Sequence, residues 1–128
     1  MNVKDPQRSK EFYVRVLKMK IEWEPDPDNV YLTSGGLDNL ALHKSESTEK
    51  NSTLDHIGFV VPTAEDVDQW HQWVKSSGAR ILKEVKTHRD GARSFYFSDP
   101  DGISIQLIYH PPIAEAAKEK GKPVASFK

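Results

Sequence analysis

The sequence of 128 residues contains no cysteine, which excludes disulfide bonds, thiolate metal ligands and cysteine nucleophiles. Any metal ion must therefore be bound through nitrogen and oxygen atoms. No charge of one sign predominates, because 18 basic side chains stand against 19 acidic ones. The composition thus gives no reason to expect nucleic acid or anionic lipid as a partner, and a small molecule is the better expectation.

Long hydrophobic runs are also missing from the sequence. No segment approaches the roughly 20 apolar residues of a membrane-spanning helix, and the N-terminal stretch MNVKDPQRSK lacks the apolar core of a signal peptide. We therefore expect a cytoplasmic protein that makes no membrane contact. A chain of this length can form one hydrophobic core but not two independent ones, so we expect residues 1–128 to form a single domain.

Two segments have the pattern of amphipathic helices. Residues 5–18 begin with a capping aspartate, place a proline at the first helical position and repeat apolar residues at helical spacing. Residues 63–77 begin with Thr63 and Asp66 at the spacing of a capping box and stop near Gly78. Both segments are predicted to be helices that bury one apolar stripe.

Each predicted helix is followed by three candidate strands. They cover residues 20–24, 30–34 and 39–44 after the first helix, and residues 80–86, 94–98 and 104–110 after the second. A further strand, residues 54–61, precedes the second helix. Phe12 aligns with Trp70 and Ile21 with Ile81 when the halves are superimposed, which suggests a duplicated motif.

The first half has no room for the whole strand that opens the second half, because only MNV could remain of it before the helix. We expect this strand to be absent, and the sheet edge that its absence exposes favours a homodimer. Within the single domain we expect a first module at residues 1–44, a linker at 45–53, a second module at 54–110 and a polar tail at 111–128. The tail could form a short helix but is expected to fray.

Three stretches, DPQRSKEFYVRVLKMKI, DHIGFVV and FYFSDPDGISIQLI, resemble the glyoxalase, bleomycin-resistance and extradiol-dioxygenase superfamily, also called the vicinal oxygen chelate proteins. The resemblance covers residues 3–110. It implies an α+β fold of two βαβββ modules, with curled mixed sheets around a cleft and often a divalent metal at its floor.

The resemblance also implies which residues bind the metal, because the family's ligands lie on the first and last strands of each module. In the second module these positions match His56 on the first strand and Gln106 on the last strand. At the position of Gln106 the family usually has Glu. In the first module one position precedes Met1 and the other is Ala41, with His43 two residues on and on the same face. The implied metal is Zn, Fe, Ni, Co or Mn, with no metal as the alternative.

Strand alternation groups these residues without reference to the family. It places His56, Gln106, Tyr96 and Ser94 on the sheet face opposite the apolar set. Tyr96 and Ser94 could donate hydrogen bonds to a bound substrate, and Arg93 could pair with its carboxylate or phosphate. Equally, Tyr96 could be a cross-strand partner and Arg93 a solvated charge.

The leading hypothesis is a metal-dependent lyase or dioxygenase that binds a small carbonyl or vicinal-oxygen compound. In this hypothesis His56 is a metal ligand, and Gln106 is either a ligand or a substrate contact. One alternative is a metal-free binding protein like the drug-sequestering members of the superfamily, and another is a truncated, inactive member. The sequence assigns no catalytic residue, because one fold of this kind hosts many reactions.

Overall fold

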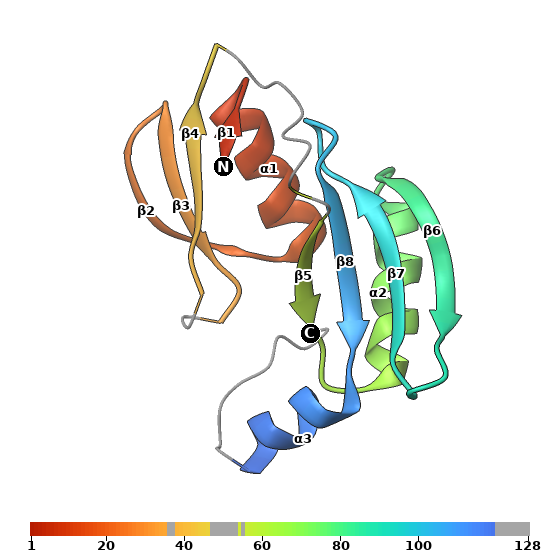
Figure 1. The fold of residues 1–128 in the computed structure, drawn as a ribbon. Coiled ribbons are helices and arrows are strands. Elements are labelled where there is room, and N and C mark those ends of the chain that lie inside the picture. Colours follow the sequence, from red (N-terminus) through yellow and green to blue (C-terminus); the bar gives the residue numbers. More distant parts are fainter. Residues whose placement is uncertain (36–37, 47–53, 55, 120–128) are drawn as a thin grey trace. The chain divides into compact units, whose positions relative to one another are not determined.

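The computed structural model describes residues 1–35, 38–46, 54 and 56–119, and they form an α+β fold (Figure 1). The chain divides into two compact units. Unit 1 is Met1–Leu54 with Asp99–Gly102, and unit 2 is Asp55–Ser98 with Ile103–Lys128. Most of the predicted linker, residues 47–53, and the end of the tail, residues 120–128, lie outside the described residues. Within the described part of the chain, no helix is long and apolar enough to cross a membrane.

Unit 1 is a four-stranded mixed sheet with one helix against one face. Its elements are β1 (Asn2–Val3), α1 (Pro6–Leu17), β2 (Lys20–Asp26), β3 (Asn29–Thr33) and β4 (Leu40–Lys44). The strand order is β1-β4-β3-β2, with β1 parallel to β4 and the other pairs antiparallel. We expected the opening strand of the first module to be absent, but a short strand of two residues, β1, lies there and pairs parallel with β4, as β5 pairs with β8 in unit 2.

Unit 2 repeats the plan with a complete opening strand. Its elements are β5 (Ile57–Val60), α2 (Ala64–Ser76), β6 (Arg80–Thr87), β7 (Arg93–Ser98), β8 (Ser104–Tyr109) and α3 (Pro111–Glu119). The strand order is β5-β8-β7-β6, with β5 parallel to β8. Buried Phe95, Phe97 and Val67 contribute to the core beside α2. We expected the C-terminal tail to fray, but its first nine residues form helix α3.

The first two helices start as the sequence predicts. The Asp5 side chain accepts hydrogen bonds from the backbone N–H groups of Gln7 (3.0 Å) and Arg8 (3.1 Å). In α2, Thr63 Oγ1 accepts from the N–H of Asp66, and the Asp66 carboxylate accepts from the N–H of Thr63, both at 3.1 Å. These bonds satisfy N–H groups that have no partner inside the helix.

Helix α1 ends at a residue in the left-handed region. Lys18 has φ 55° and ψ 27°, and it is the one non-glycine residue with positive φ in the described part of the chain. A side chain in this conformation costs about 1 kcal/mol relative to glycine. We expect Lys18→Gly to raise the free energy of unfolding by about 0.5–1 kcal/mol in urea denaturation. Lys20→Gly, in extended β2, is the matched control and should lower it.

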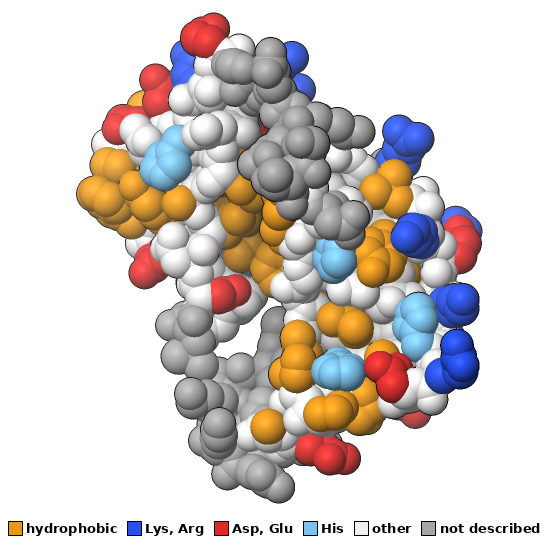
Figure 2. All heavy atoms as spheres, in the orientation of Figure 1, with side chains coloured by type: hydrophobic (Ala, Val, Ile, Leu, Met, Phe, Trp, Pro, Cys, Tyr) orange, Lys and Arg blue, Asp and Glu red, His pale blue; other side chains and the backbone are white. Residues whose placement is uncertain are grey.

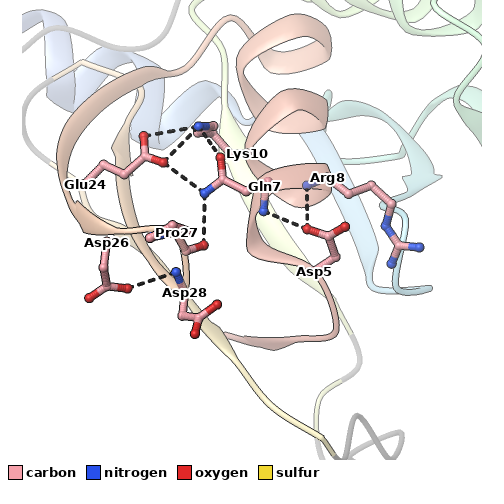
Figure 3. A network of polar contacts seen from close by, with 8 residues as sticks. All are labelled: Asp5, Gln7, Arg8, Lys10, Glu24, Asp26, Pro27 and Asp28. Atoms are coloured by element: carbon pink, nitrogen blue, oxygen red, sulfur yellow. Dashed lines mark hydrogen bonds and ion pairs between the residues drawn. The ribbon is translucent and has the colours of Figure 1, made fainter.

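A polar network ties the start of α1 to the β2–β3 hairpin (Figure 3). Gln7 Nε2 donates to Glu24 Oε1 and to the carbonyl of Pro27, both at 2.9 Å, and Lys10 Nζ bonds both Glu24 oxygens at 2.9 and 3.1 Å. The hydrogen bonds from Lys10 and then Gln7 lower the pKa of Glu24. The Glu24 carboxylate is therefore occupied by partners within the network, which indicates a structural role.

The turn at Asp99–Gly102 packs on α1 within unit 1. Gly102 has φ 85°, and its N–H closes the turn by donating to the carbonyl of Asp99 at 3.1 Å. The Asp99 carboxylate accepts from the Tyr13 hydroxyl at 3.0 Å, and both residues are buried. Asp101 accepts from two residues of α1, Arg8 (3.2 Å) and Ser9 (3.1 Å).

Tyr13 is held in its neutral form by this arrangement. Burial of the side chain, followed by the negative charge of Asp99, raises the pKa of Tyr13 well above its ordinary value. The hydroxyl therefore keeps the proton that it donates to Asp99.

Candidate functional site

The open face of the unit 2 sheet, opposite α2, carries most of the predicted site residues. The strand register pairs Gly58 with Gln106, Gln106 with Tyr96, and Tyr96 with Lys83. These four residues therefore form one row across the four strands. Their neighbours along β7 and β8 are buried on the opposite face, where α2 packs.

His56 lies directly before β5 and is joined to this row through Tyr96. The two rings meet edge to face, with centroids 5.3 Å apart and planes at 83°. Gln106 Nε2 donates a hydrogen bond to the Tyr96 hydroxyl oxygen at 2.8 Å. The structure thus brings together three of the residues that strand alternation grouped, His56, Tyr96 and Gln106.

Gly58 and Lys83, which were not predicted from the sequence, also contact members of this group. A Cβ atom added to Gly58 would lie 3.5 Å from Gln106 Oε1, so the glycine leaves space beside this oxygen. Lys83 Nζ lies 4.9 Å from the centre of the Tyr96 ring and gives the face a positive charge. The Gln106 side chain thus bonds Tyr96 through Nε2 and places Oε1 near Gly58, while Lys83 lies over the Tyr96 ring.

Ser94 and Arg93 are placed on opposite faces of the sheet. Ser94 is on the same side of β7 as Tyr96, but it is buried and its hydroxyl lies 3.3 Å from His88 Nε2. Arg93 begins β7 and binds Asp68 of α2 through Nε (3.0 Å) and Nη2 (2.6 Å). Alternation turns the Arg93 side chain to the helix-covered face, where it pairs with Asp68, so Arg93 does not share the face of Tyr96 and Gln106. Its role as a substrate contact stays a prediction.

His43 belongs to unit 1 and to a different sheet from His56 and Gln106. It lies on β4, where its Nδ1 atom is 2.8 Å from Asn29 Oδ1 and its ring meets the edge of Tyr31. Ala41, at the family's ligand position, pairs with Tyr31 across the sheet. The role of His43 as a metal ligand stays a prediction.

The donor atoms of His56 and Gln106 fit a divalent metal in chemical type. An imidazole nitrogen and an amide oxygen both bind first-row divalent ions, although neither brings negative charge. Among the described residues, no group of three His, Cys, Asp or Glu lies close enough to hold a metal. A metal at His56 and Gln106 would therefore bind more weakly than one held by a carboxylate.

A family model described as the Glyoxalase/Bleomycin resistance protein/Dioxygenase superfamily matches residues 1–107. The chain belongs to this superfamily. The family predicted from the sequence is thus confirmed, and so is its α+β fold of two mixed sheets.

Individual known proteins resemble the chain over most of its length. The metallothiol transferase FosB of Staphylococcus saprophyticus is 32% identical over 109 residues, which cover 83% of this chain and 70% of that protein. The glutathione transferase FosA of Serratia marcescens is 31% identical over 131 residues, covering 98% of this chain and 87% of that protein. The solved structure of the hypothetical protein SA1046 from S. aureus aligns with a TM-score of 0.67 and 27% identity, over 85% of this chain and 91% of that one.

Proposed function

We propose that the protein binds a small oxygen-rich molecule on the open face of the unit 2 sheet, together with a divalent metal held by His56 and Gln106. The observation that carries this proposal is the contact of both residues with one tyrosine, Tyr96. A metal bound there would supply Lewis-acid polarisation of a substrate oxygen. Because Tyr96 accepts the hydrogen bond from Gln106, its own hydroxyl proton is available for donation to a bound molecule.

The second substrate in this proposal is a small thiol. The names of the two transferases support a thiol as the transferred group, in place of the lyase or dioxygenase chemistry that we first expected. Lys83 supports the same choice, because its ammonium group attracts thiolates and the carboxylates that small thiols carry. Residence in the cytoplasm and assembly into a homodimer stay predictions.

A second candidate function, metal-free binding of a small anion, is favoured by the charge of the site. His56, Tyr96 and Gln106 are uncharged donors or acceptors when the histidine is neutral, and Lys83 adds a positive charge beside Tyr96. Such a face repels a dication and attracts an anion. This candidate corresponds to the drug-sequestering members of the superfamily.

Metal titration of four proteins tests the first proposal. Gln106→Glu adds a carboxylate at a ligand position, and we expect it to tighten Zn²⁺ and Mn²⁺ binding at least about tenfold, equivalent to about 1.4 kcal/mol. His56→Ala is expected to abolish stoichiometric binding. His88→Ala is the matched control, because His88 contacts buried Ser94 and not Tyr96 or Gln106. Calorimetry and elemental analysis give the affinity and the stoichiometry.

The two candidate functions predict different binding results for these variants. Equal metal affinity in the parent protein, His56→Ala and Gln106→Glu would contradict the metal-binding proposal. The anion-binding candidate instead predicts that inorganic phosphate binds in the presence of EDTA. Lys83→Glu should then abolish phosphate binding, whereas Gln106→Glu should weaken it by adding a negative charge.

A further inference from the structure

A series of hydrogen bonds on the unit 1 sheet fixes which nitrogen of His43 carries the hydrogen. Asn29 Nδ2 lies 2.9 and 3.1 Å from the two oxygens of Asp26, and Asn29 Oδ1 lies 2.8 Å from His43 Nδ1. An ionised carboxylate only accepts, so the Asn29 amino group must face Asp26. The Asn29 oxygen then faces His43 and also only accepts. His43 Nδ1 must therefore carry a hydrogen, and in the neutral ring Nε2 presents a lone pair.

The backbone holds the members of this Asp26–Asn29–His43 relay in place. Asp26 and Asn29 pair with each other at the β2–β3 hairpin, and Asn29 pairs with His43 across β3 and β4. Asp26 Oδ1 also accepts from the backbone N–H of Asp28 at 2.9 Å, a bond drawn in Figure 3. The carboxylate that begins the relay is thus oriented by the turn itself.

An aromatic row lies beside the relay on the same sheet. Trp23 stacks on Tyr31 with centroids 5.1 Å apart and planes at 27°, and Tyr31 meets the His43 ring at 5.6 Å and 79°. Trp23 nevertheless remains 59% exposed, which is unusual for the largest apolar side chain. Figure 2 shows a histidine beside hydrophobic side chains on this part of the surface. The row combines exposed ring surface with one oriented hydrogen-bond acceptor.

We propose that this row is a second binding site, for a planar aromatic molecule that carries an N–H or O–H group. The ring of the ligand packs on Trp23 and Tyr31, and its N–H or O–H donates to His43 Nε2. An anion is disfavoured by the lone pair at Nε2, and within the described residues His43 is not part of a group of three side chains that could hold a metal. The site uses residues of unit 1 alone and does not depend on the function proposed for unit 2.

The relay is tested by the imidazole nitrogen chemical shifts of His43, measured by NMR at a pH where the ring is neutral. We expect a protonated Nδ1 and an unprotonated Nε2. Asn29→Leu removes the acceptor and should shift the population toward Nε2–H. Asn39→Ala is the matched control, because its amide binds Glu22 instead, at 2.8 Å. A predominant Nε2–H form in the parent protein would overturn the proposal.

The binding site is tested with indole and 1-methylindole, which share a ring system but differ in the N–H donor. With EDTA present, we expect shift changes confined to β2–β4 and about fivefold tighter binding of indole, the effect of one neutral hydrogen bond. His43→Phe keeps a ring and should remove the difference, whereas Trp23→Ala should weaken both ligands. Equal affinity for the two compounds, or shift changes outside β2–β4, would overturn the proposal. Gln106→Glu should leave indole binding unchanged, which separates this result from the metal titration.

Discussion

Asp99→Ala is expected to lower the free energy of unfolding by about 3 kcal/mol, as measured by urea denaturation at neutral pH. The carboxylate is buried and accepts hydrogen bonds from the Tyr13 hydroxyl (3.0 Å) and the Asp101 N–H (2.9 Å). Each hydrogen bond to a charged group contributes about 1.5–3 kcal/mol, and relief of the buried charge offsets part of the loss. The variant also leaves the buried Tyr13 hydroxyl without its carboxylate acceptor.

Two further variants isolate this interaction. Asp28→Ala removes a carboxylate that is 60% exposed and 3.7 Å from Lys44, so its effect should stay within about 0.5 kcal/mol. Combining Asp99→Ala with Tyr13→Phe should cost clearly less than the sum of the single changes, because both remove the same bond. Strictly additive effects would show that the Tyr13–Asp99 bond does not stabilise the fold.

Much of the fold could be predicted because it follows from local rules. The capping residues Asp5 and Thr63 mark the starts of α1 and α2, and period-two alternation marks β3, β7 and β8. Alternation also places Gln106 and Tyr96 together correctly, since β7 and β8 pair without interruption from Arg93 to Ser98. A regular register lets the sequence alone decide which face a side chain occupies.

The features that could not be predicted arise where local rules are interrupted or where distant segments meet. Lys83 was missed because the β6–β7 register shifts on both sides of it, so counting along β6 does not reveal that it faces Tyr96. The predicted strand at residues 94–98 leaves out Arg93, whereas Arg93 is the first residue of β7 and follows that strand's alternation. No local pattern predicts the Tyr13–Asp99 bond, because the two residues are 86 positions apart in the sequence.

The free energy of unfolding is expected to fall as the pH rises above about 10, and Tyr13 is expected to cause part of this fall. The pKa of Tyr13 is raised in the folded protein by burial and by Asp99, so the unfolded chain releases this proton first. Between the unfolded and folded pKa values the unfolded chain binds fewer protons, which favours unfolding by about 1.4 kcal/mol per pH unit. The contribution of Tyr13 to the free energy of unfolding is fully present while the pH is below the pKa of Tyr13 in the unfolded chain. It is lost as the pH rises through the pKa of Tyr13 in the folded protein.

Comparison with Tyr13→Phe separates this effect from the titration of groups that both proteins share. At neutral pH the variant should be less stable than the parent protein, because it lacks the hydrogen bond to Asp99. Between about pH 10 and 11 the difference should shrink by about 1 kcal/mol, since the parent protein alone loses the Tyr13 contribution. Urea denaturation at several pH values measures both curves. Parallel curves over this range would mean that Tyr13 ionises as readily in the folded protein as in the unfolded chain, contrary to its burial against a carboxylate.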